Sequence, residues 1–204
     1  MDAFISLLLV GLFSTGSGLS SWSCDTGKWL SQPELDEDGI FTAVRGSECI
    51  VTSPGGKVLN LDRYLLSRVG HGTTVNEGPI DEIYEGLPGV RYDLSMRLEN
   101  DGNPMVIRSD VHFATDQKER FIYASQSKDI EASGTAGYLQ KITEKVLVVA
   151  LPENRFQFSL ASSIDVAKPW YAPSGTFKTQ MEKAFIKNFN SERDERIPHW
   201  GEKL

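Results

Sequence analysis

The stretch that decides the fold begins at Tyr92 and reads Tyr92-Asp93-Leu94-Ser95-Met96-Arg97-Leu98-Glu99. Apolar side chains occupy every second position, and polar or charged side chains fill the positions between them. Successive side chains of a β-strand point to opposite faces, so this alternation is typical of a strand with one buried face. The segment that follows, residues 100–104, is rich in Asn, Asp, Gly and Pro and predicts a tight turn.

Two further segments repeat this alternation. Residues 105–113 and 120–126 predict strands, and the polar residues 115–118 predict the turn between them. Residues 128–137 are small and polar, and they predict a loop.

A long strand is predicted at Tyr138–Leu151, and a last strand at residues 156–166. The long strand first sets Tyr138 and Ile142 against Gln140 and Glu144, and then becomes a continuous apolar run, which indicates burial on both faces. Because short turns between these strands leave no room for crossover helices, the sheet should be antiparallel.

The chain after Pro173 predicts one amphipathic helix, Ser174–Arg196. Large apolar residues recur at a spacing of four, which places them along one stripe of a helix: Phe177, Met181, Phe185 and Phe189. Ser174 or Thr176 is expected as the N-cap, and Pro198 limits the helix at its end. The stripe needs a partner surface, so the fold class is α+β, an antiparallel meander wrapped around a long C-terminal helix.

The first half of the chain gives weaker patterns. The polar segment Asp25–Asp38 predicts a solvated loop or a short helix, and Ile40–Thr52 predicts a strand with a bulge at Gly46. Leu59–Val69 predicts a helix, and Ile80–Leu87 a short helix or an extended segment. The total is six predicted strands.

The amino terminus resembles a secretory signal. The apolar run Phe4–Phe13 is too short to span a bilayer, and a Ser- and Gly-rich segment follows it. The alternative is a buried N-terminal helix or strand. The expected organisation is a signal peptide at residues 1–23, removed near residue 23, an extension at 24–38 and a single domain at 39–204. A periplasmic or secreted protein is expected, with no transmembrane span in the mature chain.

Two cysteines, Cys24 and Cys49, lie outside the apolar run. In an exported protein such a pair predicts a disulfide. Two alternatives remain open: Cys24 as a lipid-modified first residue, and Cys49 as a free buried thiol.

Charge and motifs narrow the functions. The formal net charge is −7 without a basic cluster, so binding to nucleic acid is not expected. His71 lies between glycines and is a candidate general base, although an exposed loop histidine is the plainer interpretation. His112, Asp93 and Asp110 fall on polar strand faces and should contact solvent. The histidines and cysteines show no metal-ligand spacing, so neither a metal nor a cofactor is expected.

The order of these elements resembles the helix-grip fold of the START-like (SRPBCC) superfamily, the group of lipid-transfer, pollen-allergen and polyketide-cyclase proteins. The resemblance covers roughly Ile40 to Arg196 and rests on order, with six strands predicted where the superfamily usually has seven. It implies a cavity between sheet and helix for lipids or other apolar small molecules. The wall would come from inward-facing residues: Tyr92, Met96, Phe113, Tyr138, Phe156, Phe158, Met181 and Phe185. The alternative is that these residues fill a solid core.

Three functions follow from this resemblance. The first is an exported, non-enzymatic protein that binds an apolar small molecule or lipid, and we favour it. The second is a cyclase- or hydratase-like enzyme that uses Tyr92, Tyr138 or Arg97. The third is a surface interaction protein with a filled core.

Overall fold

The structure is a computed structural model that describes residues 21–52, 73–100, 103–116, 119–153 and 155–196. The predicted helix Leu59–Val69, His71 and His199 lie outside the described residues, as do residues 1–20 of the expected signal peptide.

In the described part of the chain, nine strands precede one long helix. The elements are β1 (Ser21–Cys24), β2 (Lys28–Leu35), β3 (Ile40–Thr52), β4 (Thr73–Tyr84), β5 (Leu87–Asn100), β6 (Asn103–Thr115), β7 (Arg120–Ala132), the short helix η3 (Gly134–Tyr138), β8 (Leu139–Leu151), β9 (Arg155–Ala167), the helix α2 (Ser174–Ser191) and the π-helical turn η4 (Glu192–Arg196).

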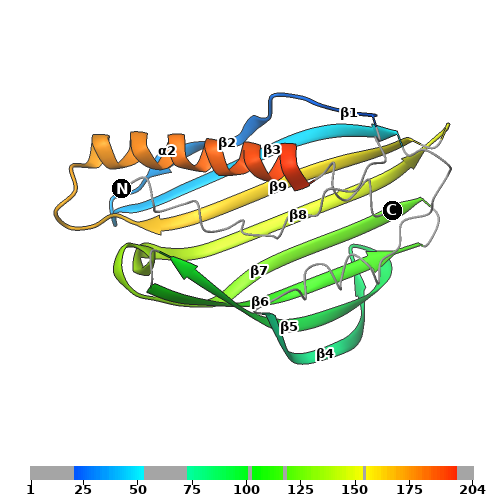
Figure 1. The fold of residues 1–204 in the computed structure, drawn as a ribbon, viewed down its shortest axis with the longest axis horizontal. Helices are drawn as coiled ribbons and strands as arrows, with labels where there is room; N and C mark the ends of the chain where they lie inside the picture. Colours follow the sequence, from blue (N-terminus) through cyan, green and yellow to red (C-terminus); the bar gives the residue numbers. More distant parts are fainter. Residues whose placement is uncertain (1–20, 53–72, 101–102, 117–118, 154, 197–204) are drawn as a thin grey trace.

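The strands form one antiparallel sheet in the order β1-β3-β9-β8-β7-β6-β5-β4, with β2 also paired to β3. From β4 to β9 each strand pairs with its neighbour in the chain, and β3 then pairs with β9 along its whole length. Figure 1 shows α2 lying along β2 and β3, with the rest of the sheet curving away from the helix towards β4. The predicted fold class, an antiparallel sheet with a long C-terminal helix in the helix-grip arrangement, is confirmed.

The predicted helix and its apolar stripe are also confirmed. The four stripe residues are each at most 3% exposed, and their helix continues through η4 to Arg196. The predicted N-cap is wrong, because Pro173 holds that position and no side chain caps the first turn. The backbone N–H of Phe177 instead donates to the carbonyl of Pro173 at 2.9 Å.

Three strands were missed in the sequence. Residues 28–35 form β2 rather than a solvated loop or short helix, Ser21–Cys24 form β1, and Thr73–Tyr84 form β4. The extended alternative for Ile80–Leu87 is correct. The segment contains the end of β4, the turn at residues 85–86 and the first residue of β5.

The one predicted irregularity is absent, and an unpredicted one lies in β7. β3 pairs with β9 without a register shift, so the bulge at Gly46 is wrong. The register between β6 and β7 does shift, since Arg108 faces Asp129 while Ser109 faces Ser127. Lys128 is thus an extra residue in β7, and the strand continues through part of the predicted loop to Ala132.

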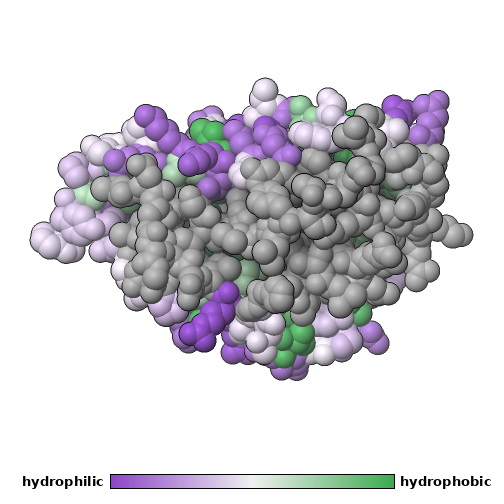
Figure 2. All heavy atoms as spheres, in the orientation of Figure 1, coloured by the Kyte–Doolittle hydropathy of each residue, from purple (hydrophilic) through white to green (hydrophobic). Residues whose placement is uncertain are grey.

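A disulfide joins Cys24 of β1 to Cys49 of β3, and the two residues lie directly opposite each other in the ladder. The predicted bridge is confirmed, and Cys49 is not a free thiol. The hydropathy view in the same orientation shows polar residues along the margin of the molecule next to α2 and β2 (Figure 2).

Candidate functional site

The face of the sheet towards α2 carries the apolar half of each central strand. A first cluster of buried residues joins the sheet to Phe189: Cys49, Val51, Leu94, Val111, Phe113, Phe121, Tyr123, Val146, Val148, Phe156, Phe158 and Leu160. A second cluster lies under the first turns of the helix: Phe41, Ala43, Ile164, Val166, Phe177, Met181 and Phe185. Together these clusters form most of the inner face.

A row of polar residues crosses the sheet between the two clusters. Arg45 of β3 is opposite Ser162 of β9, Ser162 is opposite Glu144 of β8, and Glu144 is opposite Ser125 of β7. Residues directly opposite in a ladder point to the same face, so the four form one line, which we call the polar row. 

Both sides of the polar row are apolar on β8 and β9. Two residues away from Ser162 lie Leu160 of the first cluster and Ile164 of the second. Glu144 is flanked in the same way by Val146 and Ile142.

Three of the four residues of the polar row are more accessible than the residues of the first cluster beside them. Ser125, Glu144 and Ser162 are half-buried, whereas Val146 and Leu160 beside them are 0% and 3% exposed. Inward-facing side chains that keep accessible surface indicate that the space above them is not closely packed. The middle of the inner face therefore keeps three partly accessible polar side chains.

Arg45 forms the β3 end of the polar row and is only 8% exposed. Its Nη2 donates to the carbonyls of Thr26 and Gly27 at 2.9 and 3.0 Å. The guanidinium also lies over the rings of Trp29 and Phe189, 5.2 and 5.6 Å from their centroids. Burial, and then the charge of Arg193, lower the pKa of Arg45, but carbonyls and ring faces compensate the buried cation.

The turn at Asp25–Gly27 holds this end of the structure together. It follows Cys24 directly, and the Asp25 carboxylate accepts from Ser47 Oγ at 2.5 Å and from the backbone N–H of Gly27 at 2.9 Å. Burial acts to raise the pKa of Asp25, but these bonds outweigh it and keep the pKa below its usual value. Arg193 of η4 donates from Nη1 to the carbonyl of Asp25 at 2.9 Å, so the turn links β3 to the end of the helix.

Asn188 is a second buried polar group on the inner side of α2. It is 8% exposed, and its Nδ2 has no hydrogen-bond partner within the described part of the chain. Buried amides are nearly always bonded, so an unpartnered one calls for an explanation.

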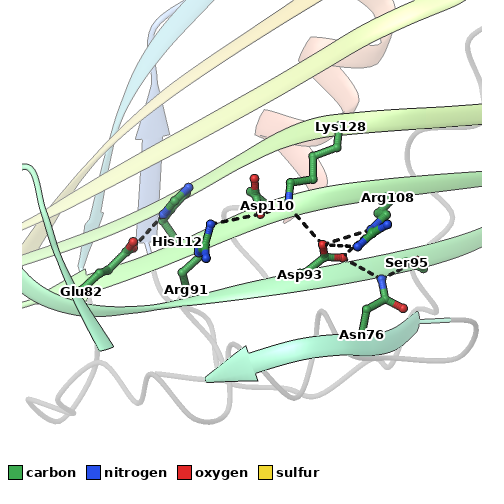
Figure 3. Close-up of polar contacts among 9 residues, drawn as sticks. All are labelled: Asn76, Glu82, Arg91, Asp93, Ser95, Arg108, Asp110, His112 and Lys128. Atoms are coloured by element: carbon green, nitrogen blue, oxygen red, sulfur yellow. Dashed lines mark hydrogen bonds and ion pairs between the residues drawn. The ribbon is translucent and has the colours of Figure 1, made fainter. Parts of the chain in front are cut away.

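On the opposite, outer face of the sheet, Asp93 is the centre of a polar network (Figure 3). The Arg108 guanidinium donates to both carboxylate oxygens, with its shortest contact from Nη2 to Oδ2 at 2.8 Å. Asn76 Nδ2 adds a bond at 2.7 Å and Lys128 Nζ one at 3.1 Å. These bonds, those from Arg108 above all, hold the pKa of Asp93 well below its usual range.

The network continues along the outer face. Lys128 Nζ contacts Asp110 Oδ1 at 2.6 Å, and Arg91 lies 3.9 Å from the same oxygen. His112 Nδ1 bonds Glu82 Oε1 at 2.7 Å, and the His112 ring stacks on Tyr84 with 4.5 Å between centroids. 

These contacts correct the expectation that Asp93 contacts solvent, since it is 4% exposed. His112 and Asp110 are half-buried rather than fully solvated. Each carboxylate of this network already has a cationic or imidazole partner, so the arrangement suits stabilisation of the sheet better than catalysis.

An open, polar depression of about 420 Å³ lies beside this network. It is lined by Asn76, Ser95, Val106, Arg108, Asp129 and Glu131. Within the described ranges no group of three or more His, Cys, Asp or Glu is arranged to hold a metal ion.

The structure places seven of the eight residues expected to form a ligand wall in or against the two clusters. Phe113, Phe156 and Phe158 belong to the first cluster, and Tyr92 packs against it. Met181 and Phe185 belong to the second, with Tyr138 packed against that cluster.

Met96 is opposite Ile107 on the inner face and is half-buried. Phe158 and Phe113 are 0% and 1% exposed, whereas Tyr92, Met96 and Tyr138 keep accessible surface. The role of the eight residues as a ligand wall stays a prediction.

Sequence reasoning missed the polar row. The sequence analysis assigned Glu144 and Ile142 to different faces of the strand. Residues two apart share a face, and Glu144 lies on the inner face with Ile142 and Val146. The strict alternation of faces along this strand was the signal that could have identified the polar row. The bulge predicted at Gly46 obscured the face to which Arg45 belongs. Arg97, which was considered for catalysis, lies opposite Val106 on the outer face.

The chain matches no family model and no curated protein. Among solved structures it is similar to a START superfamily protein from Mycobacterium smegmatis, with a TM-score of 0.36 and 12% identity over 74% of this chain and 95% of the other. It is similar to Ara h 8.0201, with a TM-score of 0.40 and 14% identity over 81% and 97% of the two chains. It is also similar to the human StarD13 (DLC2) lipid transfer and protein localization domain, with a TM-score of 0.35 and 15% identity over 79% and 88%. These are likenesses of fold alone; the described part of the chain has the helix-grip arrangement of an antiparallel sheet and a long C-terminal helix.

Proposed function

We propose that the chain is a non-enzymatic binding protein that holds an apolar small molecule or lipid between the inner face of the sheet and α2. The accessible polar row between two buried apolar clusters carries this proposal. A protein that needed only a core would gain stability from closing this gap with apolar side chains.

The chemistry of the inner face supports a ligand with an apolar body and at least one polar group. The apolar clusters on either side of the polar row would cover the body. Ser125 and Ser162 provide hydroxyls at its centre, and the unpartnered Asn188 Nδ2 is a donor on the helix side. 

Binding is favoured over catalysis by the placement of two of the three side chains considered for chemistry. Arg97 lies on the outer face, and Tyr138 is hydrogen-bonded to Tyr171. 

Native mass spectrometry of the full chain, purified from its own source, tests the proposal. We expect a fraction of the protein to carry an additional mass that denaturation releases and that solvent extraction identifies as an apolar molecule. The bare chain mass alone, together with no rise in melting temperature on addition of a lipid panel, would contradict it.

We further propose that the protein is exported to the periplasm or secreted. The bridge between Cys24 and Cys49 supports an oxidising compartment, and the apolar run Phe4–Phe13 supports a removable signal. No helix in the described ranges has both the length and the apolar character needed to cross a membrane. The mass of the chain isolated from its source, with and without alkylation under denaturing conditions, tests both features. A full-length mass with two alkylated thiols would contradict export.

A further inference from the structure

The connection between β9 and α2 carries the most exposed aromatic side chains of the described residues. Trp170 is 89% exposed and Tyr171 58%, and their rings pack edge to face with 5.7 Å between centroids. Figure 1 shows this connection projecting beyond the sheet at the end of the molecule where α2 begins. We call Trp170 and Tyr171 the aromatic tip.

The aromatic tip is held in this position by its surroundings. Lys168 Nζ donates to the carbonyls of Pro169 and Ala172 at 3.4 and 3.1 Å, and the backbone N–H of Ala172 donates to Pro169 at 3.0 Å. The Tyr171 side chain is hydrogen-bonded to Tyr138, the last residue of η3. A connection fixed on both sides keeps Trp170 in solvent, although burial of an indole ring would be favourable.

The size of the aromatic tip indicates the kind of surface it meets. Two largely exposed aromatic side chains offer on the order of 300 Å². A stable protein interface buries about 800 Å² on each partner. A projecting pair of Trp and Tyr is instead typical of residues that enter the boundary between lipid head groups and acyl chains.

The charges near the aromatic tip indicate which lipids it prefers. The turn between β2 and β3 contains Asp36, Glu37 and Asp38, and it adjoins the tip because the backbone N–H of Lys168 donates to Gly39 at 2.7 Å. The Lys168 ammonium is itself engaged with carbonyl groups. Three carboxylates beside the tip would be repelled by an anionic membrane surface.

We propose that the aromatic tip docks the protein on zwitterionic lipid bilayers. This docking is a property separate from the proposed ligand binding. It would bring the start of α2 to the bilayer, together with Ala172 and Tyr138, which pack against the second apolar cluster. An apolar ligand would then exchange at the membrane surface without crossing water.

Sedimentation of the full chain with phosphatidylcholine vesicles tests the docking. We expect the double variant Trp170→Ala, Tyr171→Ala to lose at least about tenfold in partition coefficient, equivalent to about 1.4 kcal/mol. Ile83→Ala is the matched control, because Ile83 is 72% exposed on β4 and lies away from the tip, and it should bind as the unmodified chain does. The unmodified chain should show a blue shift of Trp emission with vesicles that Trp170→Phe reduces. At low salt, phosphatidylserine should weaken binding.

Three results would overturn the docking: no binding of the unmodified chain, equal binding of the double variant, or stronger binding with phosphatidylserine. Melting temperatures confirm that each variant is folded. Binding of diphenylhexatriene without vesicles separates the two proposals. Docking predicts that the double variant binds diphenylhexatriene as the unmodified chain does. If the unmodified chain does not bind diphenylhexatriene, the proposed function is contradicted and docking is not.

Discussion

Asp93 occupies a position that strand alternation assigns to the outer face, yet it is almost inaccessible to solvent. The cause lies in three other strands. Asn76 comes from β4, Arg108 from β6 and Lys128 from the bulge in β7. The extra residue at Lys128 places its ammonium over Asp93 and Asp110. The bulge therefore re-aims one side chain, which joins Asn76 and Arg108 in covering the carboxylate.

Asp93→Asn should lower the free energy of unfolding by about 2 kcal/mol, because it removes charge-assisted hydrogen bonds. The loss should fall short of that for a fully buried pair, since the Arg108 and Lys128 side chains are 53% and 40% exposed and can turn towards water. Urea unfolding at neutral pH measures the difference. Asp129→Asn is the control, because Asp129 is exposed on the same face and should change stability little.

The same pair of variants tests the pH dependence. The pKa of Asp93 is lower in the folded chain than the unfolded value of about 3.9. Its contribution is therefore present above that pH and is lost as the pH falls towards the folded pKa. The stability gap between the unmodified chain and Asp93→Asn should narrow on acidification below about pH 4. A gap that stays constant or widens there would argue against the network.

Alanine substitutions at Gly27 and Gly86 test the packing of the Asp25–Gly27 turn against Arg45. Both have positive φ, at 71° and 81°. A Cβ at Gly27 would lie 3.2 Å from Phe189 Cε1 and 3.3 Å from Arg45 Nε, whereas a Cβ at Gly86 would meet nothing within 4 Å. Gly86→Ala should cost about 1 kcal/mol from backbone strain alone. Gly27→Ala should cost more, because Arg45 and Phe189 must also move. Equal losses in urea unfolding would show that the turn does not pack against them.

At the scale of elements, central and edge strands differ in how far the sequence predicts them. β5 and β9 bury one face, so their alternation is visible in the sequence. β4 is exposed along most of its length and has two register shifts against β5, so no apolar periodicity marks it. β2 is an edge strand with similar exposure. Edge strands with mixed polar residues avoid pairing with other chains, and the same property conceals them from pattern reading.

The disulfide adds a covalent link to the strand pairing that holds the segment from β1 to β2 on β3. Replacing Cys24 and Cys49 by Ser should lower the free energy of unfolding by about 3 kcal/mol, since the bridge closes a loop of 25 residues. Because Arg193 binds the carbonyl of Asp25, amide hydrogen exchange should also accelerate in η4 and the last turn of α2. Faster exchange restricted to β1, with η4 unchanged, would show that the helix end does not depend on the turn.

For the whole molecule, the sequence predicts the sheet, the helix and the side of the helix that packs on the sheet. Those features follow from local periodicity in single segments, such as Phe177 to Phe189. The polar row depends instead on the register of four strands, which brings Arg45 beside Ser162 across more than half of the chain. Register is set by all the pairings together, so no single segment contains it.

The most direct test of ligand binding at the inner face is a comparison of two serines on β9. Ser162 belongs to the polar row, and Ser159 lies on the outer face opposite Leu147. Titration of diphenylhexatriene into the full chain compares Ser162→Phe with Ser159→Phe, after melting curves show that both variants fold. If a ligand lies between the polar row and α2, Ser162→Phe should weaken probe binding at least about tenfold, a change of about 1.4 kcal/mol, and Ser159→Phe should not. Equal binding by the two variants would contradict a ligand site on the inner face.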